Sequence, residues 1–268
     1  MNFAIVIPTR NDRPKFVEQC KKFLRRQSVQ PSEVIWVNYS PLSNQRDITQ
    51  RYRAGVEEAT KKGYEFVVFW EDDDWYHPQY LEWLIKEWQG KGKPNFFGVG
   101  ETYYYHLVAG KSHHMKHSGR TSAFCTLVKL PWRITWPADN YAFLDMHISK
   151  HSQVITVDFP KDQVYAIGIK HGTGLTGGGG HNVNFPYNNQ NAKEWFINQI
   201  GGDKDFYENV LKELNNASIR RNSTIVNQPN NIPKVNERSN IQKREITPLN
   251  SNTQLHRRST KFIKIHKR

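Results

Sequence analysis

Cysteine is scarce in this sequence of 268 residues, and long hydrophobic runs are missing from it. The two cysteines, Cys20 and Cys125, lie far apart within apolar patterns, so we expect buried thiols rather than a disulfide framework or a cysteine zinc site. No segment approaches the run of about 18 apolar residues that a membrane-spanning helix needs. The opening MNFAIVIPTRNDR does not have the pattern of a signal peptide. We therefore expect a soluble, cytoplasmic protein.

Acidic residues are scarce in one region only, the C-terminal segment. Residues 215–268 carry a net charge of +10, whereas residues 1–214 carry only +3 of the total +13. The C-terminal segment is rich in Asn, Ser and basic residues and shows little sustained hydrophobic periodicity. Such a segment cannot bury enough apolar surface to offset its ordering entropy. We predict one folded domain at 1–214 and a disordered basic tail at 215–268.

Short apolar runs alternate with helical patterns through the first hundred residues. This alternation predicts strands at 3–7, 34–37 and 66–70, separated by helices that begin near residues 14, 48 and 78. Such repeats are typical of parallel strand-helix-strand units in a sheet that is covered on both faces. The second half is more mixed, with strands expected at 96–99, 123–128, 154–157 and 164–169 and helices at 139–150 and 207–214. The predicted fold class is α/β, with a mostly parallel, Rossmann-like central sheet flanked by helices.

Four consecutive carboxylates, Glu71 to Asp74, follow the third predicted strand. In an open parallel sheet, ligands bind beyond the carboxyl ends of the strands, where Pro8-Thr9-Arg10 and Asn38 would also lie. Carboxylate oxygens suit Mg²⁺ or Mn²⁺, and Mg²⁺ commonly completes its shell with substrate phosphates. The cluster therefore indicates a metal site for a diphosphate-bearing substrate. Acidic residues before a helix also stabilise its N-terminus, and this structural alternative stays open for Asp74.

The sequence resembles family 2-type glycosyltransferases of the GT-A fold over residues 1–180. The resemblance rests on IVIPTRND, a second strand end near Asn38 and VVFWEDDDWYHPQYLEWL, and it is strongest between residues 3 and 82. It implies a GT-A-like catalytic domain with a nucleotide-sugar half near 1–100 and an acceptor half near 101–214. It also implies metal-dependent transfer of a sugar from a nucleotide-diphosphate sugar to a hydroxyl group, with a UDP-sugar as the favoured donor.

The resemblance assigns roles to particular residues. Asp73 would be the leading ligand of Mn²⁺ or Mg²⁺, assisted by Asp72 or Asp74, with His171 as a further ligand. Glu71 would take the position often held by the family's first aspartate. The residues implied to contact the nucleotide sugar are Pro8, Thr9, Arg10, Asn38, Arg53, Asp72 and Lys170. Because the family commonly has an aspartate where this chain has Asn38, the identity of the donor stays open.

Transfer to a hydroxyl group needs a base that removes the acceptor proton, and a carboxylate is a usual choice. The resemblance implies that Asp145, in NYAFLDMHISK, is this base and that the anomeric configuration is inverted. Asp139, in WPADNY, is the rival candidate. Either aspartate could instead only cap the N-terminus of a helix.

A glycine-rich stretch, IKHGTGLTGGGGHN at 169–182, follows a predicted strand. It lacks the Gly-Lys-Ser/Thr ending of a P-loop, and it predicts either a lid that closes over the donor or a flexible linker. Lys170 can offset phosphate charge as the nucleoside diphosphate leaves.

Three histidines, at positions 113, 114 and 117, lie in KSHHMKHSGR between predicted strands. No acidic residue or cysteine is adjacent in the sequence. We therefore favour a polar acceptor loop over a zinc site.

The basic tail gives the only indication of an acceptor. Its Lys and Arg residues can neutralise phosphates, so we consider a hydroxymethylated base in DNA, of the kind that some virus-encoded sugar transferases modify. Glycan, protein and lipid acceptors are the alternatives. A second hypothesis is a nucleic-acid-binding protein on a degenerate glycosyltransferase scaffold, in which the four carboxylates are structural.

Overall fold

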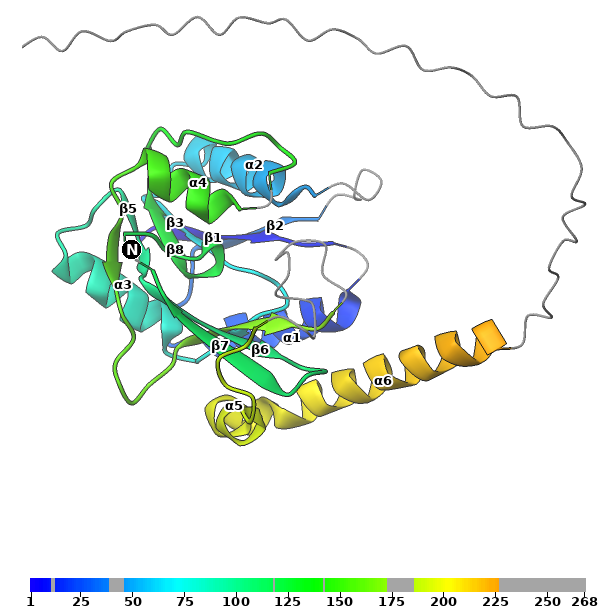
Figure 1. Cartoon of the computed structure of the whole chain (residues 1–268). Coiled ribbons are helices and arrows are strands. Elements are labelled where there is room, and N and C mark those ends of the chain that lie inside the picture. Colours follow the sequence, from blue (N-terminus) through cyan, green and yellow to red (C-terminus); the bar gives the residue numbers. More distant parts are fainter. Residues whose placement is uncertain (11–12, 39–45, 118, 142, 173–185, 227–268) are drawn as a thin grey trace, which may run out of the picture. The chain divides into compact units, whose positions relative to one another are not determined.

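The computed structural model describes residues 1–10, 13–38, 46–117, 119–141, 143–172 and 186–226, and these residues form a mixed α/β fold (Figure 1). The larger sheet has the strand order β2-β1-β3-β8-β5-β9. Its strands are β1 (Phe3–Pro8), β2 (Glu33–Val37), β3 (Phe66–Phe69), β5 (Phe96–Val99), β8 (Thr126–Lys129) and β9 (Ile155–Val157). The smaller sheet has the order β4-β10-β6-β7, with β4 (Trp75–Tyr76), β6 (Glu101–His106), β7 (Lys111–Lys116) and β10 (Ala166–Lys170). The predicted α/β class, with a central sheet flanked by helices, is confirmed.

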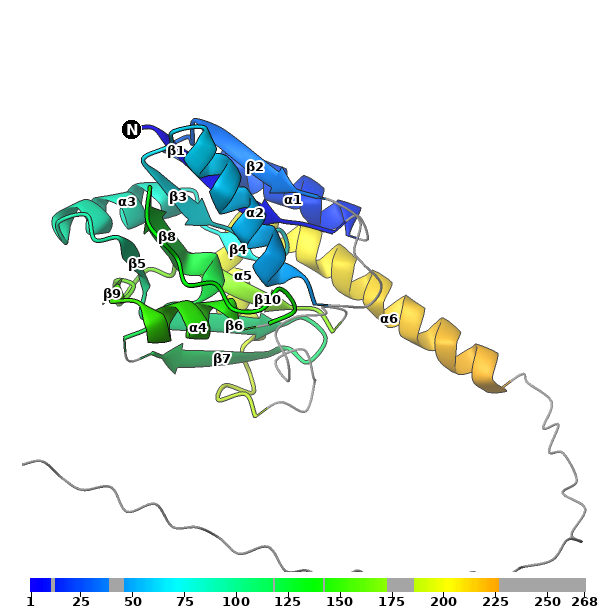
Figure 2. The same ribbon diagram turned by 90° about the horizontal axis from the view of Figure 1, so that it is seen from above.

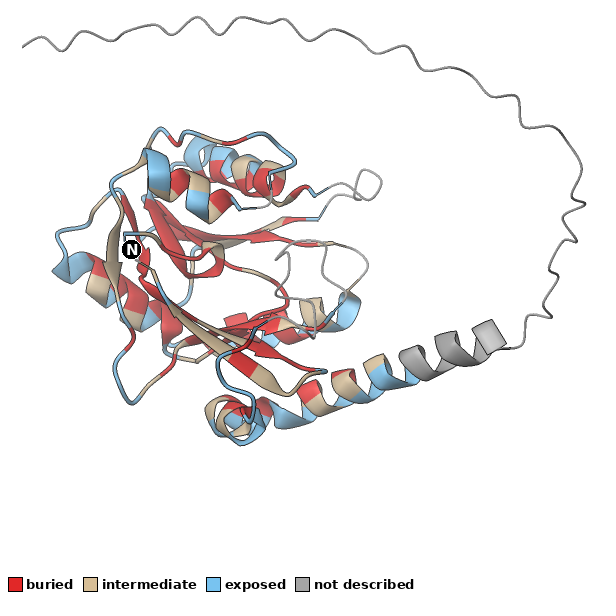
Figure 3. Cartoon of the chain, viewed as in Figure 1, coloured by how far each residue is buried: buried red, intermediate tan, exposed pale blue. Residues whose placement is uncertain are grey.

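Helices cover both faces of the larger sheet, with α2 and α4 on one face and α1 and α3 on the other (Figure 1). They are α1 (Pro14–Arg25), α2 (Ile48–Lys61), α3 (Tyr80–Gly90) and α4 (Leu144–His151). Because side chains alternate along a strand, Ala4 and Val6 of β1 pack against the core under α2 and α4, whereas Phe3 and Ile5 pack on the opposite side. All of β1 and β3 is buried (Figure 3), which explains their uninterrupted apolar runs.

The pairing of β1 decides where loops and ligands can meet. β1 pairs in parallel with β2 on one side and with β3 on the other, and β5 pairs in parallel with β9. β8 is antiparallel to both of its neighbours, so three of the five pairings in the larger sheet are parallel. The carboxyl ends of β1, β2 and β3 consequently lie at one edge of the sheet.

Close contact between α2 and β1 requires a glycine at position 55. A Cβ atom at Gly55 would overlap the Cγ1 atom of Val6 and come within 3.2 Å of Val37 Cγ2. We expect Gly55→Ala to lower the free energy of unfolding by about 1–3 kcal/mol, because the overpacked helix must move off the sheet. Urea denaturation measures the loss. Gly90→Ala, at the end of α3 with no atom within 4 Å of its added Cβ, is the control that should not destabilise the protein.

Several segments differ from the sequence prediction. Residues 111–116 form β7 rather than a polar loop, and the first half of the predicted strand at 123–128 is a 3₁₀ turn, η1 (Ala123–Cys125). Strand β7 was missed because its residues are mostly polar and give no apolar alternation. Helix α6 (Lys204–Val226) includes residues 215–226, which the sequence pattern assigns to the tail. Helix α5 (Lys193–Ile200) and the turn η3 (Gly201–Asp203) were not predicted.

Other sequence predictions concern solubility, the thiols and two segments of the chain. Cys20 and Cys125 are both buried and free, as predicted. No helix among the described residues has both the length and the apolar character to span a bilayer. The glycine-rich residues 173–182 and the segment 227–268 lie outside the described residues, so the predictions of a lid and of a disordered tail remain predictions.

Candidate functional site

The ends of β1, β2 and β3 bring together several of the residues singled out from the sequence. Thr9, just beyond β1, donates its backbone N–H to the Val37 carbonyl of β2 at 3.1 Å. Trp70, just beyond β3, donates its N–H to the Val6 carbonyl at 3.1 Å, and the chain then turns through the four carboxylates. Asn38 follows β2 and is exposed. The predicted convergence of strand ends is therefore present in the fold.

Arg51, on α2, fixes two of these strand ends and was not singled out from the sequence. Its side chain is only 1% exposed. One guanidinium nitrogen, Nη1, donates to the carbonyl of Thr9 at 2.6 Å and to that of Val37 at 2.9 Å. The other, Nη2, forms an ion pair with Asp47 at 2.7 Å. Arg51 thus supplies a donor to the Thr9 carbonyl and a second donor to the Val37 carbonyl, where β1 and β2 end.

Arg53, which the resemblance placed at the nucleotide sugar, lies on the outer side of α2. It forms an ion pair with Asp139, the rival candidate for the base, and both side chains are partly or largely exposed, at 30% and 50%. Arg10 follows β1, and its Nη1 lies 3.7 Å from Asp47. Because Arg53 pairs with Asp139, the rival candidate for the base is engaged in a surface ion pair.

The acidic turn, Glu71 to Asp74, divides into parts with different partners. Asp72 is 2% exposed, accepts a hydrogen bond from the Thr9 hydroxyl at 2.5 Å and forms an ion pair with Arg13 Nη2 at 2.7 Å. Asp74 is equally buried and accepts the backbone N–H of Ile169, in β10, at 2.7 Å. The turn is therefore tied both to the end of β1 and to the smaller sheet.

Asp73 lies between two basic side chains, Arg13 and His171. His171 is 1% exposed, and its Nε2 atom lies 2.9 Å from Asp73 Oδ2, to which Arg13 Nη1 also donates. Burial opposes the charge of Asp73, but Arg13 and His171 outweigh it and hold the pKa of this carboxyl well below its usual value. The predicted association of Asp73 with His171 is present, although the residues are 98 positions apart.

Glu71, Asp73 and Asp74 form the one group of three potential metal ligands found among the described residues, with their ligand atoms within 4.8 Å of one another. Burial, reinforced by the charge of Asp73, raises the pKa of Glu71 to about 7. Burial, reinforced by Glu71 and Asp73, raises the pKa of Asp74 well above its usual value. The Oδ2 atom of Asp74 is buried without a hydrogen-bond partner. These carboxylate oxygens fit Mg²⁺ or Mn²⁺, whose charge would favour the ionised carboxylates.

Lys170 and Asp145 approach the acidic turn from other elements. Lys170, the last residue of β10, places its Nζ atom 4.8 Å from the centre of the Tyr104 ring, and its charge lowers the pKa of Glu71, Asp73 and Asp74. Asp145, in the first turn of α4, is close enough to raise the pKa of Glu71. Burial raises the pKa of Asp145 itself, against the opposing effects of backbone hydrogen bonds, Arg120 and Lys170. The basic side chain of Lys170 and the further carboxyl group of Asp145 therefore lie close to the candidate metal ligands.

His114, in β7, and His117, just beyond its end, have separate partners. His114 lies 2.8 Å from Glu101, on β6, and stacks on Tyr103 with ring centres 4.2 Å apart. His117 hydrogen-bonds to Thr102 and accepts the Nε–H of Arg120 at 3.3 Å. Burial and the charge of Arg120 lower the pKa of His117 to about 4. Glu101 is an acidic partner that the sequence did not reveal, and it contacts His114.

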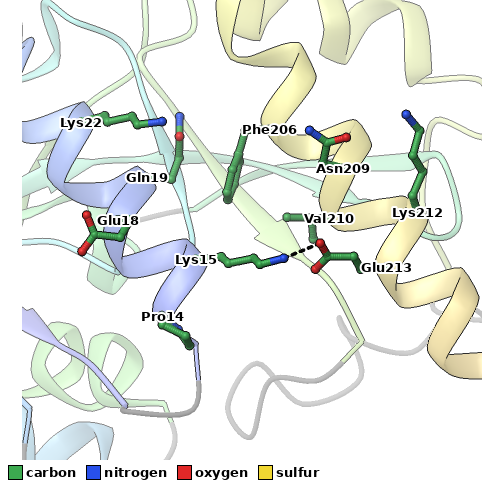
Figure 4. Close-up of a pocket in the computed structure, with 10 residues that line it drawn as sticks. All are labelled: Pro14, Lys15, Glu18, Gln19, Lys22, Phe206, Asn209, Val210, Lys212 and Glu213. Atoms are coloured by element: carbon green, nitrogen blue, oxygen red, sulfur yellow. Dashed lines mark hydrogen bonds and ion pairs between the residues drawn. The ribbon is translucent and has the colours of Figure 1, made fainter.

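A groove of about 630 Å³ lies between α1 and α6, and no residue of the acidic turn lines it. The two helices lie near each other in both views of the fold (Figures 1 and 2), and Figure 4 shows the lining side chains. Lys15 crosses the groove to form an ion pair with Glu213. None of the site residues predicted from the sequence lines it.

The sequence matches no protein-family model and no curated protein sequence. Among solved structures, S. aureus TarS 1-349 in complex with UDP-GlcNAc matches with a TM-score of 0.43 and 12% identity, over 64% of this chain and 59% of that chain. The same protein in complex with UDP matches with a TM-score of 0.40 and 14% identity, over 63% of this chain and 60% of that chain. A197 from STIV matches with a TM-score of 0.37 and 12% identity, over 62% of this chain and 89% of that chain. The chain thus spans less than two thirds of TarS 1-349, and similarities of this size assign no activity.

Proposed function

We propose that this protein is a metal-dependent glycosyltransferase that moves a sugar from a nucleoside-diphosphate sugar to a hydroxyl acceptor. The observation that carries the proposal is the carboxylate group Glu71, Asp73 and Asp74 at the strand ends, with His171, Lys170 and Asp145 close to it. Asp73 and Asp74 are buried and Glu71 is half-buried. The GT-A resemblance of residues 1–180 agrees with this arrangement. Buried carboxylates whose pKa values are raised are common at functional sites.

The donor diphosphate would be held at the acidic turn. Asp73, Asp74, Glu71 and His171 would hold Mn²⁺ or Mg²⁺, which when bound supplies a Lewis acid for the departing diphosphate. Thr9 keeps Asp72 oriented through its hydroxyl. Lys170 adds a positive charge beside the same carboxylates and would offset the charge of the leaving group.

Asp145 is proposed as the base that accepts the proton of the acceptor hydroxyl. Its raised pKa makes the carboxylate a better proton acceptor than an exposed aspartate. Asp139 is less suited, because it is exposed and paired with Arg53. Direct attack by an acceptor activated in this way would invert the anomeric configuration.

The proposal is tested by incubating the full chain with Mn²⁺ and a panel of UDP-, GDP- and dTDP-sugars. We expect release of the nucleoside diphosphate from at least one donor, stopped by EDTA and restored by added Mn²⁺. Asp73→Asn should lose at least roughly tenfold in rate, because a neutral amide replaces a negatively charged carboxylate ligand. Chromatography of the nucleotides measures the reaction. Absence of donor turnover across the panel in the wild-type protein would contradict the proposal.

The acceptor class is tested in the same reactions by mass spectrometry. The net charge of +10 in residues 215–268 favours a polyanionic acceptor, so hydroxymethylated DNA and plain DNA are the first pair to compare. A hexose or pentose mass shift on hydroxymethylated DNA alone would identify the acceptor. Gel shifts with DNA in the absence of donor turnover would instead support the nucleic-acid-binding alternative.

A further inference from the structure

Arg13 lies just before α1, and its guanidinium group forms ion pairs within the acidic turn. Its Nη2 atom bonds to Asp72 at 2.7 Å, and its Nη1 atom bonds to Oδ2 of Asp73. The same Nη1 lies 3.5 Å from His171 Nε2. Its side chain is 19% exposed, compared with 1% for Asp72 and 10% for Asp73. Arg13 therefore closes the turn from its more exposed side.

Arg13 uses the atoms that the proposed metal would need. Oδ2 of Asp73 accepts from Nη1 and lies 2.9 Å from His171 Nε2, so the guanidinium nitrogen adjoins both candidate ligand atoms. Mg²⁺ binds its ligands at about 2.0–2.1 Å. A divalent cation bound to Asp73 and His171 would come very close to the positive charge of Arg13, in a partly buried setting where like charges repel strongly.

We infer that Arg13 is the resident counter-cation of the acidic turn and that a divalent metal ion must displace its guanidinium group from Asp73 in order to bind. The inference rests on the proposed metal-dependent function. Arg13 neutralises carboxylates that would otherwise repel one another, and its charge lowers the pKa of both Asp73 and Glu71.

The contact with Asp72 makes this exchange reversible. Asp72 is outside the three-carboxylate group and is held by the Thr9 hydroxyl, so its bond to Arg13 Nη2 does not depend on the metal. Arg13 can therefore release Asp73 while it stays anchored to Asp72. When the metal leaves, the guanidinium group returns to Asp73. The metal affinity of the free protein is consequently set by this competition as well as by the ligands.

The test measures Mn²⁺ binding to the full chain without nucleotide, by the loss of the electron paramagnetic resonance signal of free Mn²⁺. Arg13→Gln removes the competing charge, and we expect its Kd for Mn²⁺ to fall on the order of tenfold. Mn²⁺ should also raise the Tm of Arg13→Gln more than that of the wild type. Lys15→Gln removes the same charge two residues along the chain, in the exposed pair with Glu213, and should leave the Kd within about twofold.

Equal or weaker Mn²⁺ binding by Arg13→Gln would overturn the inference and leave the proposed metal site standing. If neither the wild type nor Arg13→Gln binds Mn²⁺, the proposed metal dependence fails and the inference fails with it. Asp73→Asn should abolish the binding in both backgrounds, which ties the signal to this site. Should Arg13→Gln not fold, Arg13→Met takes its place, because methionine also removes the competing charge and keeps a long side chain beside the turn. Tighter Mn²⁺ binding than in the wild type is again the expected result, and equal or weaker binding contradicts it.

Discussion

Asp145→Asn is expected to lower kcat/KM for sugar transfer between about a hundredfold and ten-thousandfold, the range for loss of a positioned general base. The amide has nearly the same shape and can still accept the backbone hydrogen bonds of the first turn of α4, so the helix should form normally. Mn²⁺ binding should be unchanged, because Asp145 is not one of the three clustered carboxylates. Initial rates at saturating Mn²⁺ measure the effect.

The pH profile gives an independent test of Asp145. A base must be ionised, and burial raises the pKa of Asp145 above its ordinary value. Activity at saturating Mn²⁺ should therefore fall as the pH decreases through this raised pKa, at a higher pH than for an exposed aspartate. The residual activity of Asp145→Asn should lose this limb and keep only the decline that follows protonation of the metal ligands. Asp139→Asn is the matched control and should keep most of the activity. A larger loss in Asp139→Asn than in Asp145→Asn would reverse the assignment of the base.

Arg51→Met is expected to lower the free energy of unfolding by about 3–5 kcal/mol. Methionine fills much of the same space but leaves the carboxylate of Asp47 without its 2.7 Å ion pair and the Thr9 carbonyl without its Arg51 donor. The Val37 carbonyl keeps only the Thr9 N–H. Arg10, 3.7 Å from Asp47, can compensate only part of the charge. Urea denaturation followed by tryptophan fluorescence measures the loss.

Arg53→Met makes the same substitution two residues along α2 and serves as the control. Its ion pair with Asp139 is 30% and 50% exposed, and exposed pairs contribute less than about 1 kcal/mol. The two variants together separate the buried contact from helix propensity and net charge, which change equally in both. Similar losses in the two proteins would contradict the role assigned to Arg51.

The acidic turn shows how far the sequence could lead. Its position after a buried strand was predictable, because uninterrupted apolar runs and polar strand ends are local properties of the chain. The grouping of Glu71 with Asp73 and Asp74, and the different direction taken by Asp72, were not predictable. Side chains in a tight turn point in directions set by backbone angles and by partners such as Ile169 in β10.

The contacts of the arginines also could not be predicted from the sequence. In the sequence, Arg51 and Arg53 are both basic residues of one predicted helix, and only Arg53 is among the residues implied to contact the nucleotide sugar. The fold buries Arg51 against the ends of β1 and β2 and leaves Arg53 at the surface. Likewise, nothing in the sequence indicated that Arg13 would pair with carboxylates 59 and 60 positions away.

Local patterns in the sequence predicted the α/β class, the order of the first strands and helices, the acidic turn at a strand end and the burial of both cysteines. These features follow from apolar periodicity and from residue chemistry, which are written locally along the chain. Tertiary structure alone decided which carboxylates group together, which arginine supports the strand ends and which cation faces Asp73. These choices depend on contacts between residues distant in sequence, and burial gives such contacts their strength because it removes competing water.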